Sequence, residues 1–202
     1  LRYSSCPGCH SSGAPRDVSV RCRRQRQKGI RDSLETDEQL LTTPEGDSLA
    51  RFGSGLLPVD QELGAVSSPV FNYPYDRTRE ALETMRQAQE WDPCHGLKMK
   101  YVNPITGDYA MPTMATFMQL LPKGFEGGTY QSTDGMVYVC VEGEGQTEIG
   151  DETFSWGPRD TFVVPSWIEH SHKVAGSDAV LFSFSDRVVQ KKIGLWREKR
   201  GA

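Results

Sequence analysis

A chain of 202 residues suits one domain with room for an arm or a tail. Its hydrophobic fraction of 37% and its charged fraction of 25% are slightly polar for a compact domain, so we expect part of the chain not to pack. The formal net charge of −4 argues against a protein built to hold nucleic acid, and no run of about 18 apolar residues offers a membrane span. We therefore expect neither nucleic acid nor membrane as a partner.

The cysteines and the first residues bear on the compartment. Five cysteines are an odd number and a poor disulfide framework. No leader of basic, apolar and then small residues opens the chain, so we expect a cytoplasmic protein with reduced thiols. The chain starts with Leu1 rather than Met, which indicates a truncated product.

Residues 1–45 differ in composition from the rest of the chain. Eight Arg or Lys and one acid, Asp17, lie between Leu1 and Arg31, and the sparse apolar residues show no period of 2 or 3.6. Residues 32–47 then turn acidic. Such a segment cannot bury enough apolar surface to offset its ordering entropy. We predict a disordered basic and acidic extension.

Two patterns in this extension have a chemical interpretation. Cys6, Cys9 and His10 fit the C-x-x-C-H pattern of haem attachment, and Cys22 would make the same group a Cys3His zinc knuckle. The basic stretch from Arg21 to Lys28 could touch nucleic acid, but it lacks the interleaved aromatic residues that stacking requires. We favour an accidental extension and a solvated arm.

Residues 46–97 are predicted to be an extended arm and a helix that connect two domains. The run SPVFNYPYD at residues 68–76 is too apolar to sit free in water, so we expect it to lie across a partner surface in a homo-oligomer. Asp76 is a plausible N-cap for a helix running to about Glu90. The polar face of this helix suits solvent or a subunit contact.

Residues 98–202 read as strands. The predicted strands cover residues 115–121, 136–141, 146–149, 153–156, 161–165, 170–174 and 179–184. Short strands with a turn signal about every eight to twelve residues indicate an all-β sandwich or barrel. Gly150 and Asp151 separate two alternating strands, as in a two-residue hairpin. The tail after Val188 is basic and helix-like.

Two blocks carry the pattern on which the chemistry depends. They are GTYQSTDGMVYVCVEGEGQTEIG at residues 128–150 and GPRDTFVVPSWIEHSHKV at residues 157–174. They resemble the two motifs of a cupin, a double-stranded β-helix or jelly-roll barrel. In metal-binding cupins the first motif carries His-x-His, whose side chains share one face of a strand, and the second motif supplies a third His.

The metal positions are mostly changed in this chain. Counting back from the Glu142–Gly145 turn places the two His positions on Tyr130 and Ser132. Counting on from Pro165 in the second block places the third His position on His170. Because one of three ligands is kept, we expect a metal-free barrel with His170 as a remnant of the triad. His172 shares a face with His170, but two His without a third ligand bind iron poorly.

Longer runs resemble the gentisate 1,2-dioxygenases, with salicylate and 1-hydroxy-2-naphthoate dioxygenases as related families. The runs are EGDSLARFGSGLLPVD, SSPVFNYPYDRTREALETMR, KMKYVNPITGDYAMPTMATFMQLLPKGF, STDGMVYVCVEGEG, WGPRDTFVVPSW and DAVLFSFSDRVVQKKIGLWRE. The likeness spans residues 45–198. NYPYDRTREAL and the FSFSDR to GLWRE end are more specific than the cupin motifs.

This resemblance implies a bicupin enzyme of which the chain is the C-terminal part. The N-terminal barrel of the family holds Fe(II) on three His, and the C-terminal barrel usually lacks a complete triad. The implied reaction is an extradiol-type ring cleavage of a small aromatic hydroxy acid, from gentisate and O2 to maleylpyruvate. The chain alone would bind no iron and be inactive. The alternative is a metal-free cupin that acts as a structural or oligomerisation module.

The remaining chemical side chains receive simpler interpretations. We assign His95 to a surface turn, and Asp160 and Asp186 to turns beside strands rather than to acid–base work. Arg187 is expected to pair with Asp186 or with a neighbouring barrel, and Cys140 to be a buried inert thiol.

Overall fold

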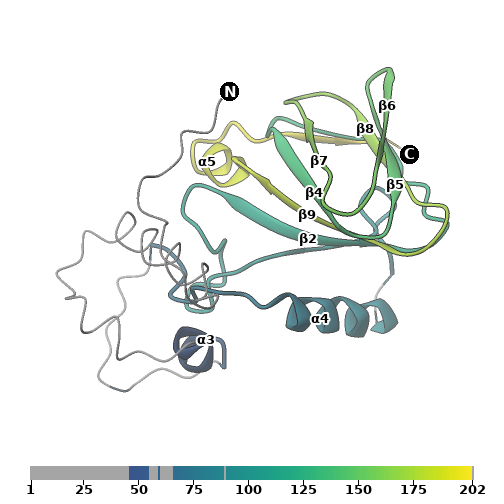
Figure 1. Cartoon of the computed structure of the whole chain (residues 1–202). Coiled ribbons are helices and arrows are strands. Elements are labelled where there is room, and N and C mark those ends of the chain that lie inside the picture. Colours follow the sequence, from purple (N-terminus) through teal and green to yellow (C-terminus); the bar gives the residue numbers. More distant parts are fainter. Residues whose placement is uncertain (1–45, 55–58, 60–65, 89, 202) are drawn as a thin grey trace, which may run out of the picture. The chain divides into compact units, whose positions relative to one another are not determined.

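Two antiparallel sheets face each other and close into a barrel (Figure 1). The computed structural model describes residues 46–54, 59, 66–88 and 90–201. These residues belong to one compact unit, Gly46–Ala202. The all-β prediction is therefore confirmed for the part of the chain that the structure describes. The domain boundaries at residues 45 and 97 stay predictions.

The strands are short and join in two orders. The first sheet runs β1-β2-β9-β4-β7 and the second runs β10-β3-β8-β5-β6. Their bounds are β1 Leu97–Lys100, β2 Ala115–Leu121, β3 Tyr130–Ser132, β4 Met136–Glu142, β5 Gly145–Ile149, β6 Glu152–Trp156, β7 Thr161–Val164, β8 His170–Lys173, β9 Ala179–Ser185 and β10 Glu198–Arg200. The seven predicted strands are thus confirmed. Three strands of three or four residues, β1, β3 and β10, were missed.

Strand alternation directs one set of side chains into the barrel. In β4, Met136, Tyr138 and Cys140 are buried while the residues between them are partly exposed. Successive side chains of a strand point to opposite faces, so these three line the interior. They pack there with Phe117 of β2 and Leu181 of β9. An apolar interior cluster thereby holds the two sheets together.

The helix α4 (Tyr75–Ala88) covers the outer face of the first sheet, as Figure 1 shows beneath β2 and β9. Leu82 is fully buried against Leu97, Met118, Leu120 and Val180. This is why β2 and β9 are buried on both faces over most of their length, although the polar Gln119, Ser183 and Ser185 interrupt their apolar residues. The helix is an integral layer of the domain.

The helix departs from the sequence prediction at its start and on its polar face. It begins at Tyr75, so Asp76 lies in its first turn and is not the N-cap. Its polar face does not serve solvent alone: Arg79 pairs with Glu142, and Arg86 pairs with Asp178 of the barrel. These ion pairs clamp the helix to its own sheet.

The aromatic arm before the helix also folds back on its own chain. Tyr73 donates a hydrogen bond of 2.7 Å to the carbonyl of Val102, and the backbone N–H of Ser68 donates to the carbonyl of Ala110. Val70 is buried, whereas Phe71 is exposed. Much of the apolar surface that we assigned to a partner is therefore covered within the domain.

Two glycines make the sharp turns before and after β5. Gly150 has φ 57° between β5 and β6, which confirms the predicted two-residue turn. Gly143 has φ 76° before β5, and a Cβ there would collide with the backbone of Asp178. Both positions require the left-handed conformation that glycine tolerates.

The C-terminal tail was only partly predicted. It begins with a short helix, α5 (Arg187–Lys192), and then pairs as β10 with β3. A further short helix, α3 (Asp47–Phe52), precedes the arm. None of the helices among the described residues is long and apolar enough to cross a membrane. The candidates Cys6, Cys9, His10, Cys22 and the basic stretch at residues 21–28 lie outside the described residues.

Candidate functional site

Polar side chains gather in the interior of the barrel. Those buried there are His95, Gln119, Ser132, Asp134, His170, His172, Ser183, Ser185 and Arg187. A buried polar group costs free energy unless it is hydrogen-bonded, and a buried charge costs more unless it is paired. The partners of these groups therefore decide what this interior can do chemically.

The three positions that correspond to a cupin metal triad do meet in the structure. Tyr130 and Ser132 are alternate residues of β3, and both are buried. Tyr130 is the direct partner of His170 in β8, with ring centroids 5.6 Å apart. His172 lies two residues further along β8, and its ring centroid is 5.5 Å from that of His170. The correspondence of Tyr130, Ser132 and His170 to a metal triad stays a prediction.

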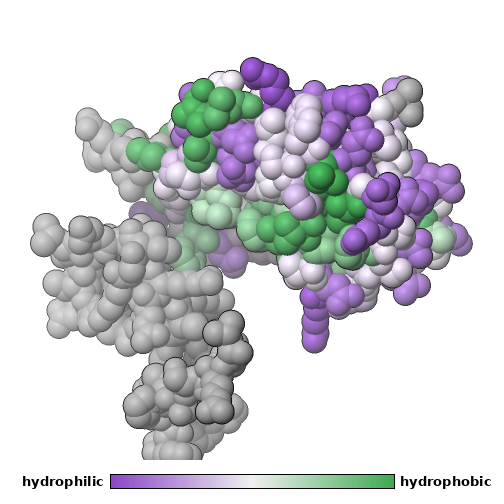
Figure 2. Space-filling model, turned by 90° about the horizontal axis from the view of Figure 1, so that it is seen from above, coloured by the Kyte–Doolittle hydropathy of each residue, from purple (hydrophilic) through white to green (hydrophobic). Residues whose placement is uncertain are grey.

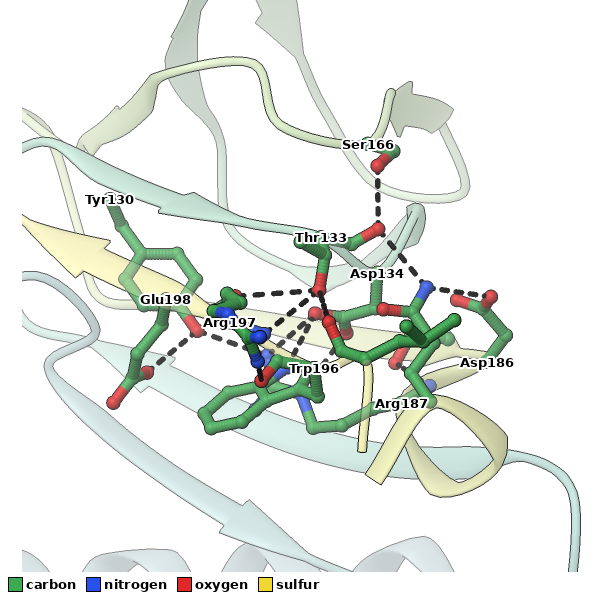
Figure 3. A network of polar contacts seen from close by, with 12 residues as sticks. Tyr130, Thr133, Asp134, Ser166, Asp186, Arg187, Trp196, Arg197 and Glu198 are labelled. Atoms are coloured by element: carbon green, nitrogen blue, oxygen red, sulfur yellow. Dashed lines mark hydrogen bonds and ion pairs between the residues drawn. The ribbon is translucent and has the colours of Figure 1, made fainter. Parts of the chain in front are cut away.

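Tyr130 is engaged as a hydrogen-bonding phenol. Its hydroxyl donates to Glu198 at 3.0 Å and accepts from Arg187 at 3.1 Å (Figure 3). Burial raises the pKa of Tyr130 to about 12, although the positive charge of Arg187 acts in the opposite direction. The group is consequently a neutral phenol at neutral pH, and its oxygen is already shared between two partners.

The two histidines of β8 are held neutral. Burial, aided by the positive charge of Lys98, lowers the pKa of His170 to about 4. Burial lowers the pKa of His172 well below its usual value, with further effects from His170 and Lys98. Neutral imidazoles can accept as well as donate hydrogen bonds, so their tautomers matter.

A short relay of hydrogen bonds fixes one side of His172. Trp156 donates to the hydroxyl of Thr147 at 2.8 Å, and that hydroxyl lies 2.8 Å from Nδ1 of His172. If the Thr147 hydroxyl donates to Nδ1, the imidazole proton of His172 sits on Nε2. That Nε2 atom is buried and has no hydrogen-bond partner among the described residues.

A buried ion pair closes one end of the barrel. Nε of Arg187 lies 3.0 Å from the carboxylate of Asp134, and Trp196 donates to the same carboxylate at 3.0 Å (Figure 3). Burial raises the pKa of Asp134, but the charge of Arg187 and hydrogen bonds that include Ser132 outweigh it and leave the pKa below its usual value. The guanidinium also lies over the Trp196 ring, 5.0 Å from its centroid.

These contacts correct the interpretation of Arg187. It pairs with Asp134 inside its own barrel, not with Asp186 or a neighbouring barrel. Adjacent residues at the start of a helix point in different directions, which explains why Asp186 is out of reach of the pair. Asp186 instead accepts a hydrogen bond from Gln190 one turn later. Asp160 accepts one from the backbone of Gly157, which is the turn role that we expected.

His95 is buried, and its assignment to a surface turn was wrong. The carboxylate of Asp92 accepts hydrogen bonds from the backbone N–H groups of Cys94 and His95, each at 2.9 Å, which makes the expected tight turn. The strand β1 follows this turn directly and belongs to the barrel wall, so His95 is buried beside it. The His95 ring is 7% exposed and meets the Tyr130 ring edge-on at 4.3 Å. The turn was read correctly, but the strand after it was missed.

Lys98 on β1 is the functional candidate that sequence reasoning overlooked. It pairs in register with Gln119, so both side chains face the interior. Its ammonium is buried over the faces of two aromatic rings, 5.1 Å from the centroid of Phe117 and 5.4 Å from that of Tyr138. The run LKMK is too short to show a periodic pattern, so the sequence alone does not predict that this lysine is buried.

A pocket opens at this end of the barrel. Its volume is about 340 Å³, and its lining includes His95, Lys98, Phe117, Arg187 and Arg200. Glu90 and Asp92 also line it, and Asp92 is paired with Arg200. The pocket joins the surface to the polar interior.

Comparisons with known proteins agree with this architecture. Residues 116–185 match a model described as a cupin domain. The chain is 60% identical over 164 residues to the gentisate 1,2 dioxygenase 1 of Aquipseudomonas alcaligenes, covering 81% of this chain and 47% of that protein. Residues 116–185 thus form a cupin domain, and the chain is similar to part of a gentisate 1,2-dioxygenase. The resemblance read from the sequence, to the C-terminal part of such proteins, is thereby confirmed.

This gentisate dioxygenase-like cupin is also similar to two 1,2-dioxygenases that are named for other substrates. The 5-aminosalicylate 1,2-dioxygenase of Comamonas sp is 33% identical over 77% of this chain and 42% of its own length. A crystal structure of the salicylate 1,2-dioxygenase of Pseudaminobacter salicylatoxidans superposes with a TM-score of 0.71 at 27% identity, covering 89% of this chain and 53% of that one. The chain thus spans about half the length of the relatives that it matches.

The residues of this cupin do not fit a catalytic iron. A three-ligand facial site needs three donors with free lone pairs and open positions beside them. Here one position is a phenol already bonded to Glu198 and Arg187, and another is the hydroxyl of Ser132. Among the described residues no group of three His, Cys, Asp or Glu is placed to hold a metal. The role of His170 as a remnant of the triad stays a prediction.

The cysteines in the described residues behave as expected for buried thiols. Cys94 and Cys140 are both buried and free. Burial, helped by the charge of Asp160, raises the pKa of Cys140 to about 11. A thiol with so high a pKa is a poor nucleophile at neutral pH.

Proposed function

We propose that this chain is the C-terminal cupin part of an iron-dependent ring-cleaving dioxygenase that acts on a small aromatic hydroxy acid. The observation that carries the proposal is the 60% identity to a gentisate 1,2-dioxygenase over 81% of the chain. Gentisate is the substrate that this identity favours, with O2 as the second substrate and maleylpyruvate as the product.

The position of the bond that is broken in gentisate shows that the term extradiol, which we used for the reaction above, is inaccurate. An extradiol enzyme cleaves beside two hydroxyls on neighbouring carbons. Gentisate carries its hydroxyls on opposite sides of the ring, and cleavage falls between the carbons that bear the carboxylate and one hydroxyl. The term ring-cleaving 1,2-dioxygenase, which the relatives' names carry, is therefore the accurate one.

We further propose that Fe(II) is held outside this cupin and that the chain alone is inactive. The occupied hydroxyl of Tyr130 and the replacement of a second ligand position by Ser132 support this. In the whole protein the cupin would support the folding and positioning of the iron-bearing part. Its closed Arg187–Asp134 network suits such a structural role.

The test is to purify the 202-residue chain and measure both iron and turnover. Elemental analysis should find no stoichiometric iron after incubation with Fe(II) and dialysis. An ultraviolet assay for maleylpyruvate should show no product until an iron-bearing cupin from the gentisate 1,2-dioxygenase of Aquipseudomonas alcaligenes is co-expressed with it. Turnover by the chain alone, with iron bound, would overturn the placement of the metal outside this cupin.

A second candidate is a metal-free cupin that acts as an oligomerisation module. The apolar side chains left exposed favour it: Val189, Ile193 and Leu195, in and after α5, are 37%, 61% and 60% exposed. Figure 2 shows separate apolar patches on a mixed surface. Complementation of ring cleavage by co-expression would exclude this candidate, whereas a stable homo-oligomer with no rescue would support it.

A further inference from the structure

The pocket beside β1 contains one buried positive charge without a matching negative one. Of the other cations that line it, Arg187 is paired with Asp134 and Arg200 with Asp92, and the exposed Lys100 donates to the carbonyl of Gly107. Lys98 has neither an ion pair nor a hydrogen-bond partner for its buried ammonium among the described residues. Burying an unpaired charge is costly, and stacking over two aromatic rings offsets only part of that cost.

Other groups beside Lys98 offer hydrogen-bonding atoms, but no carboxylate of the described residues forms an ion pair with it, although Glu90 and Asp92 line the same pocket. Nδ1 of His95, which lines the same pocket, is buried and has no partner within the described part of the chain. The NH2 group of the neighbouring Gln119 donates to the backbone carbonyl of His95 at 2.8 Å, whereas its Oε1 is buried and makes no hydrogen bond to the Lys98 ammonium or to any other described residue. An acceptor brought in from solution would complete this site, because the fold supplies none to the ammonium.

We propose that this pocket binds a small organic carboxylate, with the ammonium of Lys98 as its counter-ion and His95 as a second polar contact. The proposal does not depend on the assignment of the chain to a ring-cleaving dioxygenase. It concerns a pocket in a cupin whose residues do not provide a set of iron ligands.

Charge and shape select an organic monoanion over an inorganic anion. Only one buried cation is uncompensated, whereas a phosphate dianion would also face the carboxylates of Glu90 and Asp92, which line the same pocket. Phe117 gives the lining an apolar part that an inorganic ion would not use. A volume of about 340 Å³ is at the small end of ligand pockets. A one-ring aromatic acid has the matching size, charge and apolar body.

Near neutral pH, Lys98 is divided between its charged and its neutral form, so a bound anion can shift its protonation. Burial, together with the positive charge of Arg187, lowers the pKa of Lys98 to about 7. A bound carboxylate would favour the ammonium form and raise this pKa again. The site would then take up a proton together with its ligand when it binds near neutral pH.

The experiment is a calorimetric titration of the 202-residue chain with benzoate, which has no hydroxyl next to its carboxylate and so cannot chelate a metal as gentisate does. Benzamide, its neutral analogue of the same shape, and inorganic phosphate are titrated in parallel. Lys98→Met should weaken benzoate binding about tenfold or more, because a charge-assisted contact is lost. Lys123→Met, on an exposed residue away from the pocket, is the matched control.

The outcomes are separable. Benzoate binding that is lost in K98M, kept in K123M and not shared by benzamide supports the proposal. Absence of benzoate binding to the unchanged chain, equal binding by K98M, equal binding of benzamide, or tighter binding of phosphate would each overturn it. Circular dichroism checks that K98M is folded, and K98Q provides a second variant if it is not. Because no iron or turnover is measured, failure here leaves the dioxygenase assignment untouched.

Discussion

Arg187 and Asp134 lie 53 positions apart in the chain, yet their side chains form an ion pair of 3.0 Å that is almost wholly shielded from water. The Asp134 side chain is fully buried, and that of Arg187 is 11% exposed. The pair ties the turn before β4 to the start of α5. Tyr130 and Trp196 add hydrogen bonds to it, so four separate segments meet at this point.

Replacing Asp134 with Asn should therefore destabilise the domain strongly. The change leaves the Arg187 charge buried without its partner, and breaking a buried pair in this way costs about 3–5 kcal/mol. Urea denaturation followed by tryptophan fluorescence measures the loss. Glu148→Gln breaks the exposed pair with Lys173 and should leave the midpoint nearly unchanged. Equal midpoints for the two variants would contradict a structural role for the buried pair.

The buried histidines should make the domain sensitive to mild acid. The pKa of His170 is lowered to about 4, and the pKa values of His95 and His172 are lowered well below their usual value, in each case chiefly by burial. The unfolded chain then binds more protons than the folded one below about pH 6.5, so stability falls as the pH falls from 6.5 towards 4. For His170 alone the shift corresponds to about 3 kcal/mol.

Denaturation curves at a series of pH values between 4 and 7 measure this slope. Asp92, Asp134 and Asp178 have lowered pKa values and contribute in the same direction, but only below about pH 4, because their usual value is 3.8. His170→Gln should therefore flatten the upper part of the curve. A wild-type stability that does not change between pH 4 and 6.5 would show that these imidazoles are not buried as described.

Local sequence patterns suffice for part of the fold. The β-branched and apolar run at residues 136–141 and the glycine of the β5–β6 turn are local signals, and both were interpreted correctly. The alignment of Tyr130, Ser132 and His170 came from motif spacing, because a strand fixes which side chains share a face. These features need no knowledge of the partner strands.

The remaining features depend on contacts between distant segments. The strands β1, β3 and β10 have three or four residues, too few for a periodic signal, and they exist because other strands offer them backbone hydrogen bonds: β1 pairs with β2, and β3 pairs with β8 and β10. Without β1, His95 was taken for a surface residue and Lys98 was overlooked. The pairing of Arg187 with Asp134 depends on the closure of the barrel, which no local pattern encodes.

Leu82 offers a test of whether α4 is a structural layer of the cupin. Its side chain is completely buried against the outer face of the first sheet. Leu82→Ala should cost about 2–5 kcal/mol through lost burial and the cavity that remains. Gln87→Ala changes an exposed residue of the same helix and should have little effect. If the two variants unfold at the same temperature, α4 does not contribute to the core.

The last prediction concerns the pH dependence of Lys98. Burial and Arg187 lower its pKa from 10.5 to about 7 in the folded chain. Between pH 7 and 10.5 the unfolded chain therefore binds the extra proton, and stability should rise with pH in this window. The charged or titratable groups that act on Lys98 or on which it acts are Arg187, Asp134, Asp92, Arg200, His95, His170 and His172. The histidines stay neutral above pH 7 and the other four keep their charges, so the rise between pH 7 and about pH 9 belongs to Lys98. Above about pH 9 the raised pKa values of Cys94 and Cys140 act in the opposite direction.

A bound carboxylate should reverse the preference of the buried Lys98 for its neutral form. Benzoate stabilises the ammonium of Lys98, so its affinity should fall by up to tenfold per pH unit above about pH 7. Titrations in two buffers of different ionisation enthalpy at pH 8 should reveal proton uptake on binding. In K98M both the alkaline rise in stability and the proton uptake should vanish, whereas K123M should keep them. A benzoate affinity that is constant from pH 6 to 9 would mean that the lysine is already charged or is not the counter-ion.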